Sequence, residues 1–223
     1  MKKAQITEIF KSIQGEGPYV GEEQTFVRFH GCNLECSFCD EREKTFPQEY
    51  TAASFMDNVI SEGGKTISFT GGEPLLYSDF LKEVLPALKE KGFKIYLETN
   101  GTFKDRLLDV IEYVDVISMD FKLPSSTGEK AFWSEHFDFL RSAVKKQVFV
   151  KVVVTEFTDV SDIEKACSII EGVDKNITFI IQPVSYNGFV ASIPNLDELI
   201  ENAKKNLTDI RVIPQVHKIL GVK

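Results

Sequence analysis

The sequence predicts an α/β protein in which parallel strands alternate with covering helices. Short runs rich in β-branched and aromatic residues alternate along the chain with longer segments of helical spacing. Two of these runs, 148–154 and 177–181, are almost continuously apolar, as strands buried on both faces are. No linker, repeat or charge block divides the 223 residues, so a single domain over residues 1–223 is expected.

Taken in order, the expected strands cover residues 25–30, 65–70, 94–98, 114–120, 148–154, 177–183 and 209–213. The expected helices cover residues 52–61, 80–91, 104–111, 135–145, 160–171 and 196–206. Segment 80–91 carries one apolar stripe at helical spacing and ends before Gly92; the stripe is Leu81, Val84, Leu85 and Leu88. Asp159 or Ser161 is a suitable cap for helix 160–171. About six βα units are too few for a closed eight-stranded barrel, which leaves an open partial barrel or a doubly wound sheet.

The composition limits which binding partners and which cellular location are expected. The net charge of −8 makes nucleic acid or an anionic membrane a poor partner. No apolar run approaches the ~18 residues of a membrane span. The first residues lack the apolar core of a signal peptide. A cytoplasmic protein that binds neither nucleic acid nor membrane is expected.

Three of the four cysteines form the most informative motif. Cys32, Cys36 and Cys39 have the spacing C-x3-C-x2-C directly after an expected strand, whereas Cys167 stands alone at helical spacing and is expected in the core. Three thiolates suit a 4Fe–4S cluster with one iron open to another ligand. A structural zinc site would need a fourth ligand, and three unligated thiols in such density would be prone to oxidation.

Polar groups also follow the other expected strands. Segment 70–74 reads Thr-Gly-Gly-Glu-Pro, and its two glycines allow a ligand to approach the backbone closely. Segments 98–102, 118–122 and 182–185 end three further strands. Because the carboxyl ends of parallel strands share one edge, these segments are expected to form one site.

Two features lie outside these strand ends. Segment 13–17 is a Gly-rich polar loop followed by Pro18, which suits contact with a ligand. Arg28 alternates with Phe and Val in an expected strand, so its guanidinium is expected either to bind a ligand carboxylate or to form a structural ion pair.

The cysteine spacing, with Phe38 just before the last cysteine and the Gly-Gly-Glu segment after the next strand, resembles the radical S-adenosylmethionine (SAM) superfamily. Segments 10–40 and 214–222 closely resemble the 7-carboxy-7-deazaguanine synthase family within it, and segments 98–102 and 122–126 also fit. The resemblance implies an incomplete, modified (β/α)6 radical SAM partial barrel and a homodimer.

The resemblance also implies roles for individual residues. The cluster ligands would be Cys32, Cys36 and Cys39. Glu73 would hold the amino group of SAM, and the full SAM set would be Phe38, Cys39, Asp40, Gly71, Gly72, Glu73, Gly101, Ser118, Asp120, Lys122, Gln182, Pro183, Val184 and Ser185. The substrate set would be Ile13, Gln14, Gly15, Glu16, Arg28, Thr99, His217 and Lys223. It implies no catalytic side chain beyond the cofactor radical.

The implied reaction is a radical ring contraction. In the family, a 5′-deoxyadenosyl radical removes hydrogen from C6 of 6-carboxy-5,6,7,8-tetrahydropterin, and rearrangement with loss of ammonia gives 7-carboxy-7-deazaguanine for queuosine-type pathways. An electron donor such as a flavodoxin or ferredoxin would reduce the cluster. The alternatives are a glycyl-radical-enzyme activase, which leaves Arg28 and segment 214–223 without a role, and a non-catalytic metal-binding module, which leaves segment 70–74 unexplained.

Glu41 departs from the family pattern. Many members have Thr directly after the Cys-Asp pair, where it helps to hold Mg2+, and this chain has Glu41 there. A carboxylate is a suitable Mg2+ ligand. The same side chain could instead occupy the place of the metal, and the segment that follows is shorter than in some members. We expect reduced dependence on Mg2+.

Overall fold

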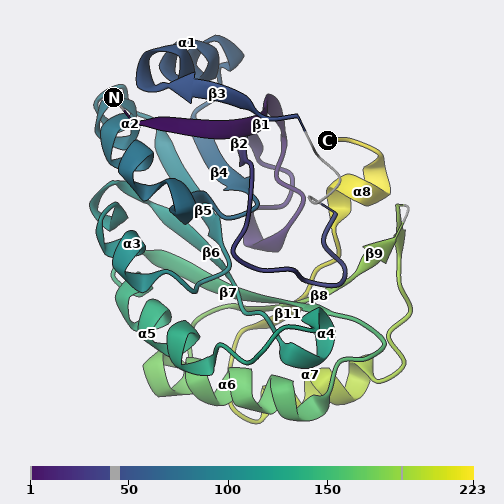
Figure 1. Cartoon of the computed structure of the whole chain (residues 1–223). Coiled ribbons are helices and arrows are strands. Elements are labelled where there is room, and N and C mark those ends of the chain that lie inside the picture. The colour runs from purple at the N-terminus through teal and green to yellow at the C-terminus, as the bar shows by residue number, and fades with distance from the viewer. Residues whose placement is uncertain (1, 41–45, 187) are drawn as a thin grey trace.

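A nine-stranded sheet forms the framework of the protein (Figure 1). The computed structural model describes residues 2–40, 46–186 and 188–223. The strand order is β11-β8-β7-β6-β5-β4-β2-β1-β3. The strands are β1 (Lys3–Ile13), β2 (Glu23–Phe29), β3 (Gln48–Thr51), β4 (Thr66–Gly71), β5 (Lys94–Thr99), β6 (Val116–Asp120), β7 (Gln147–Val154), β8 (Phe179–Pro183) and β11 (Ile210–Val212). A separate hairpin pairs β9 (Ser185–Tyr186) with β10 (Phe189–Val190).

The order of the parallel strands distinguishes between the two expected architectures. From β2 through β4, β5, β6, β7 and β8 to β11, every pairing is parallel and the strands follow one another in chain order. A doubly wound sheet would reverse its strand order at a switch point. Right-handed crossovers in an unreversed order place each helix on the same face, and Figure 1 shows the long helices gathered on the outside of the sheet. The sheet is not closed, so the prediction of an incomplete barrel is confirmed.

The helices bury their apolar faces against this sheet. They are α1 (Ala52–Glu62), α2 (Ser78–Glu90), α3 (Lys104–Leu108), α4 (Pro124–Thr127), α5 (Trp133–Ala143), α6 (Val160–Asp174), α7 (Leu196–Lys204) and α8 (Val216–Leu220), with 3-10 turns η1 (Gly17–Tyr19), η2 (Pro74–Tyr77) and η3 (Ile111–Tyr113). In α2 the whole predicted apolar stripe is buried. Asp159 caps α6, because its side chain accepts a hydrogen bond from the amide of Ser161 at 2.8 Å. None of the described helices combines the length and the apolar character that a membrane span requires.

Several boundaries differ from the expectations. The strand expected from residue 114 begins at Val116, two residues later, because Val114 serves as the C-cap of η3. The helix expected at 104–111 ends at Leu108, and the helix expected to end at 171 continues through Gly172 to Asp174. These differences shift element ends without changing the order of elements.

Strands β1 and β3 were not expected. β1 pairs antiparallel with β2 and with β3, at the edge of the sheet. Only Ala4 and Ile6 of β1 are buried, so its sequence lacks the apolar character of the central strands. A register shift between Ile6 and Glu8 places Glu8 opposite Arg28 of β2.

The inner face of the sheet is filled towards the amino ends of the strands. Tyr96, Val116, Phe149 and Ile180 form a small apolar cluster there. Tyr19 of η1 packs edge-on against Tyr96, with 5.5 Å between the ring centroids. This packing closes one end of the inner face, which leaves the carboxyl ends of the strands to form the site.

Candidate active site

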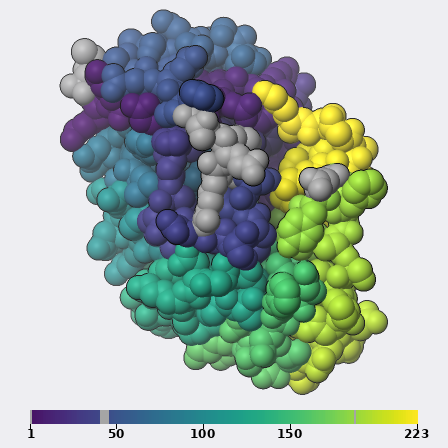
Figure 2. Space-filling view, turned by 45° about the vertical axis from the view of Figure 1, so that its right-hand side comes forward, coloured from purple at the N-terminus to yellow at the C-terminus, as the bar shows by residue number. Residues whose placement is uncertain are grey.

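A cavity of about 720 Å³ opens at the carboxyl ends of the parallel strands. Its wall includes the ends of the strands from β2 to β8, the loop after β1, residues 30–40 (the cysteine loop) and parts of residues 214–223 (the C-terminal segment). Figure 2 shows the cysteine loop and the C-terminal segment, in yellow, on the same face of the molecule. Residues distant in sequence therefore meet around one space.

The cysteine loop is held by contacts with α4. The amide and the hydroxyl of Ser37 donate hydrogen bonds to the carbonyls of Thr127 (2.8 Å) and Ser126 (3.0 Å). Cys32 is exposed, Cys36 is buried and Cys39 is half-buried, and all three line the cavity. Burial raises the pKa of Cys36 to about 11, and the protein that surrounds one side of Cys32 raises the pKa of that thiol as well. A thiolate at these positions therefore requires a cation to bind it.

The turn after β4 lies directly against the cysteine loop. The amide of Glu73 donates to the carbonyl of Gly31 at 2.9 Å. A Cβ added at Gly72 would collide with that same carbonyl, so only glycine permits this approach. The Gly-Gly pair thereby fixes the distance between the cysteine loop and the end of β4.

Glu73 is completely buried beneath this turn. Its carboxylate accepts hydrogen bonds from the amide of Leu75 (3.0 Å), the hydroxyl of Thr99 (2.9 Å) and the amide of Asn100 (2.8 Å). Burial raises the pKa of Glu73 to about 7, although these donors favour its charged form. In this arrangement Glu73 joins the turn after β4 to the end of β5.

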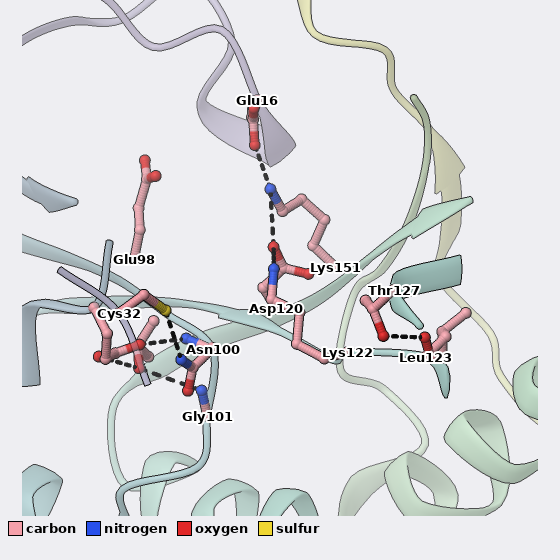
Figure 3. Close-up of polar contacts among 12 residues, drawn as sticks. Glu16, Cys32, Glu98, Asn100, Gly101, Asp120, Lys122, Leu123, Thr127 and Lys151 are labelled. Atoms are coloured by element: carbon pink, nitrogen blue, oxygen red, sulfur yellow. Dashed lines mark hydrogen bonds and ion pairs between the residues drawn. The ribbon is translucent and has the colours of Figure 1, made fainter. Parts of the chain in front are cut away.

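Asn100 connects the end of β5 to the first cysteine (Figure 3). Its side-chain amide donates to the sulfur of Cys32 at 3.7 Å and to Oδ1 of Asn33 at 2.8 Å. The carbonyl of Asn100 lies 3.1 Å from Nε2 of His136. His136 stacks on Phe121, and burial lowers its pKa to about 4, so it is a neutral ring.

Buried acceptors line the cavity at the ends of β6 and β8. Asp120 Oδ2 accepts a hydrogen bond from Lys122 at 2.8 Å. Within the part of the chain that the structure describes, no donor reaches Oδ1 of Asp120 or Oε1 of Gln182, and both atoms are buried. A buried acceptor without a donor is costly, so this wall is suited to a ligand that presents hydroxyl or amino groups.

Glu16, Glu98 and Lys151 form a charged group deeper in the cavity. Lys151 donates to Glu16 Oε2, and Gln215 donates to Glu16 Oε1 at 2.7 Å. Burial alone would raise the pKa of Glu16, but the Lys151 ammonium holds it at about 2. Glu98 accepts from Gln14 (3.0 Å) and Thr70 (2.8 Å), and burial, together with the nearby Glu16 carboxylate, raises its pKa.

Arg28 lies at the side of the cavity formed by β1 and β2. Its Nε atom is 3.2 Å from Glu8 Oε2, and its guanidinium carbon lies 5.5 Å from the ring centroid of Phe10. Lys223 Nζ lies 2.9 Å from the other oxygen of Glu8 and 5.2 Å from the same ring centroid. Two cations from distant parts of the chain therefore share one carboxylate and one aromatic ring.

The C-terminal segment is fastened along this side. The amide of Val216 donates to the carbonyl of Gly15 at 2.9 Å, and Lys218 Nζ lies 2.7 Å from Asp40 Oδ2. Burial lowers the pKa of His217, which lines the cavity. The segment thus connects the loop after β1 with the residue that follows Cys39.

The cavity collects most of the residues singled out from the sequence. Those that line it are Ile13, Gln14, Gly15, Glu16, Arg28, Cys32, Cys36, Phe38, Cys39, Asp40, Gly71, Gly72, Thr99, Ser118, Asp120, Lys122, Gln182, Val184, Ser185, His217 and Lys223. Glu73, Gly101 and Pro183 do not line this cavity, and their expected contacts with SAM stay predictions. Glu41 lies outside the described residues.

Comparison with known proteins identifies the family. The model of the radical SAM superfamily matches residues 26–164. A 7-carboxy-7-deazaguanine synthase from Geobacter sulfurreducens is 39% identical, and the alignment covers 98% of this chain and 97% of that protein. The chain belongs to the 7-carboxy-7-deazaguanine synthase family.

Other similarities agree with this assignment. A 7-carboxy-7-deazaguanine synthase from Methanocaldococcus jannaschii is 33% identical, with 97% of this chain and 99% of that protein covered. The crystal structure of QueE from Escherichia coli superimposes with a TM-score of 0.67 at 20% identity, covering 96% of this chain and 95% of that chain, which supports the fold. The activase alternative receives no support from these comparisons.

Radical SAM proteins carry a 4Fe–4S cluster and SAM, and the cavity fits both groups. Three cysteine sulfurs from one loop reach the same space, and Cys167, buried in α6, is not part of its wall. Among the described residues, no set of three His, Cys, Asp or Glu side chains is spaced to hold a single metal ion. In a cluster each cysteine binds its own iron. The unpartnered acceptors of Asp120 and Gln182 suit the hydroxyl and amino groups of SAM.

Several residues of the cavity wall were given no individual role from the sequence, although Thr70, Glu98 and Asn100 lie in segments that were expected at the site. These residues are Glu8, Thr70, Glu98, Asn100, Lys151 and Gln215. Lys151 interrupts an otherwise apolar strand, and Glu98 is the acidic residue at the end of another. A lone charge in a strand buried on both faces needs a partner, and this signal could have identified both residues.

Proposed function

We propose that the protein converts 6-carboxy-5,6,7,8-tetrahydropterin into 7-carboxy-7-deazaguanine, with loss of ammonia, in 7-deazapurine biosynthesis of the queuosine type. The names of its relatives support the product. The observation that carries the proposal is that Cys32, Arg28 and Glu16 reach one cavity from three different segments. A cluster ligand, a cation for a carboxylate and an acceptor for a pterin edge are thus combined in one site.

The protein's first task is to hold its cofactors. Cys32, Cys36 and Cys39 would bind three irons of the cluster, and Asp120 and Gln182 would accept hydrogen bonds from SAM. When bound, the cluster and SAM supply the one-electron chemistry that begins with removal of a hydrogen atom from the substrate. Glu73 would bind the amino group of SAM, or it would position the Thr99–Asn100 turn through the hydrogen bonds that its carboxylate accepts there.

Its second task is to orient the substrate. Arg28 and Lys223 would bind the substrate carboxylate, because both cations line the cavity near the Phe10 ring. Glu16 would accept hydrogen bonds from the N–H groups of the aminopyrimidone ring, and Ile13, Gln14, Gly15, Thr99 and His217 would complete the pocket. A fixed orientation matters because a radical would react with any nearby C–H bond.

The remaining features of the proposal concern conditions and partners. The protein would act as a cytoplasmic single-domain enzyme, as a homodimer, with a flavodoxin or ferredoxin as its electron donor. Glu41 would reduce the dependence on Mg2+ relative to members with Thr at that position.

Anaerobic turnover with matched substrates tests the proposal. Reconstituted protein with SAM and dithionite should form 7-carboxy-7-deazaguanine from 6-carboxy-5,6,7,8-tetrahydropterin. It should form no deazapurine from the tetrahydropterin that lacks the carboxyl group. Equal use of both pterins would contradict the assigned role of Arg28 and Lys223, and no product from either would contradict the function.

A further inference from the structure

Lys151 is a buried charge that the proposed function leaves without a role. It lies in the middle of β7, where only 8% of the residue is exposed. Its ammonium group lies between two carboxylates, donating to Glu16 Oε2 and lying 3.5 Å from Asp120 Oδ2. Figure 3 shows Glu16, Lys151 and Asp120 in one row that continues to Lys122.

This row joins the two halves of the cavity. Asp120 belongs to the wall with unpartnered acceptors at the end of β6, and Glu16 belongs to the loop after β1. Asp120 has a second cation, because Lys122 donates to the same oxygen at 2.8 Å. Loss of Lys151 would therefore leave Asp120 paired but would remove the cation from Glu16.

Glu16 is held from two directions. Its Oε1 accepts from Gln215 of the C-terminal segment at 2.7 Å, while its Oε2 accepts from Lys151. Its backbone amide donates to Gln14 Oε1 at 3.0 Å. Without Lys151, one carboxylate oxygen would lose its charged donor inside a largely buried site.

We propose that Lys151 is a positioning residue that orients Glu16, as an ionised carboxylate, towards the aminopyrimidone ring of the substrate. The inference rests on the proposed function, because it takes Glu16 as a group that binds the pterin. An ionised carboxylate can accept two N–H groups from such a ring, whereas a protonated carboxyl presents an O–H donor to the same edge. Lys151 acts through Glu16 and does not itself contact the pterin.

The pH dependence of binding separates this role from a purely structural one. The titratable groups that face Glu16 are Lys151 on β7, Glu98 and Tyr96 on β5, and His217 on α8. In the native protein Glu16 has a pKa of about 2 and stays ionised at pH 5 and above. Without Lys151, only the Gln215 hydrogen bond and the nearby His217 would oppose the effect of burial. The pKa of Glu16 would therefore rise, and Glu16 would take up a proton more readily as the pH falls.

The experiment is a fluorescence titration of the reconstituted protein with 6-carboxypterin between about pH 5 and pH 7. At pH 7, Lys151→Met should bind 6-carboxypterin at least ~10-fold more weakly than the native protein does. Lowering the pH to 5 should weaken its binding by about another 10-fold, and this loss should exceed any change in the native protein. Lys151→Arg should restore the native pH dependence. Lys89→Met is the matched control, because Lys89 pairs with Asp115 at 2.6 Å away from the cavity wall, and it should bind as the native protein does.

A double variant keeps the test valid if Lys151→Met alone folds poorly. In a Glu16→Gln background, Lys151→Met should cause less than ~2-fold further loss, because the two residues act as one unit. Native-like binding by Lys151→Met, or weaker binding with the native pH dependence, would overturn the proposal while leaving the proposed function intact. Failure of the native protein itself to bind 6-carboxypterin would overturn both.

Discussion

The imidazole of His217 occupies the space in which a side chain on Gly15 would lie. The amide of Val216 donates to the carbonyl of Gly15 at 2.9 Å, so the C-terminal segment rests directly on the loop after β1. Glycine at position 15 is therefore what allows residues 202 positions apart to form one wall of the cavity.

Gly15→Ala should damage the site without unfolding the protein. The new methyl group would displace His217 and with it the C-terminal segment, and we expect the KM for the pterin to rise at least ~10-fold. The measurement is anaerobic steady-state kinetics, with thermal denaturation of the same preparation. Gly172→Ala is the control, because no atom lies within 4 Å of a Cβ there. It should leave kinetics unchanged and stabilise α6 by about 0.5–1 kcal/mol. Unchanged kinetics in Gly15→Ala would contradict the assigned wall.

The four cysteines should divide into two classes. Cys32→Ala, Cys36→Ala and Cys39→Ala should each prevent assembly of a stable cluster, because each removes one of three iron ligands. Cys167→Ala should retain full iron content, since this thiol is completely buried in α6. Iron and sulfide analysis after anaerobic reconstitution checks the expectation for each of the two classes. Loss of the cluster in Cys167→Ala would require a fourth cysteine ligand.

Much of the fold could be predicted because its signals are local. The central strands are mostly apolar, and the α2 stripe has helical spacing, so both are visible in short windows. Strand β1 was missed because it lies towards the edge of the sheet with only Ala4 and Ile6 buried. Its pairing partners, β2 and β3, are what make it a strand.

The candidate site also has one part that could be predicted from the sequence and another that could not. The cysteine spacing and the Gly-Gly turn are contiguous, and the topology brings strand ends together, so both were predictable. The Lys218–Asp40 and Lys151–Glu16 ion pairs join residues far apart in sequence, and although the charge of Lys151 in an apolar strand indicates that it needs a partner, the sequence does not show which residue that partner is. Such pairs depend on the tertiary packing of the C-terminal segment and of the loop after β1.

Arg28→Ala should weaken binding of the substrate while leaving SAM chemistry in place. A charge-assisted contact of this kind is worth roughly 1.5–3 kcal/mol, so KM for the pterin should rise at least ~10-fold. Arg28→Lys should recover only part of this loss, because an ammonium cannot make a bidentate pair. Reductive cleavage of SAM without pterin, measured in parallel, should remain near the native rate. Native KM in Arg28→Ala would show that Arg28 serves only its ion pair with Glu8.

Removal of divalent cations should have a limited effect on the native protein. Glu41 adds a negative charge where many family members have Thr, and we expect activity to persist after exhaustive chelation. Glu41→Thr should become more dependent on added Mg2+, because the site would then offer a neutral ligand. Turnover of both proteins with and without Mg2+ provides the comparison. Complete loss of native activity on chelation, with full recovery on adding Mg2+, would contradict this expectation and would make Glu41 a candidate metal ligand.

The stoichiometry of anaerobic turnover tests the central claim most directly. Reconstituted protein would be supplied with SAM, dithionite and 6-carboxy-5,6,7,8-tetrahydropterin, and the pterin consumed, the 7-carboxy-7-deazaguanine formed and the ammonia released would be quantified together. The account predicts one deazapurine and one ammonia for each pterin consumed. Cleavage of SAM with the pterin recovered unchanged would contradict it.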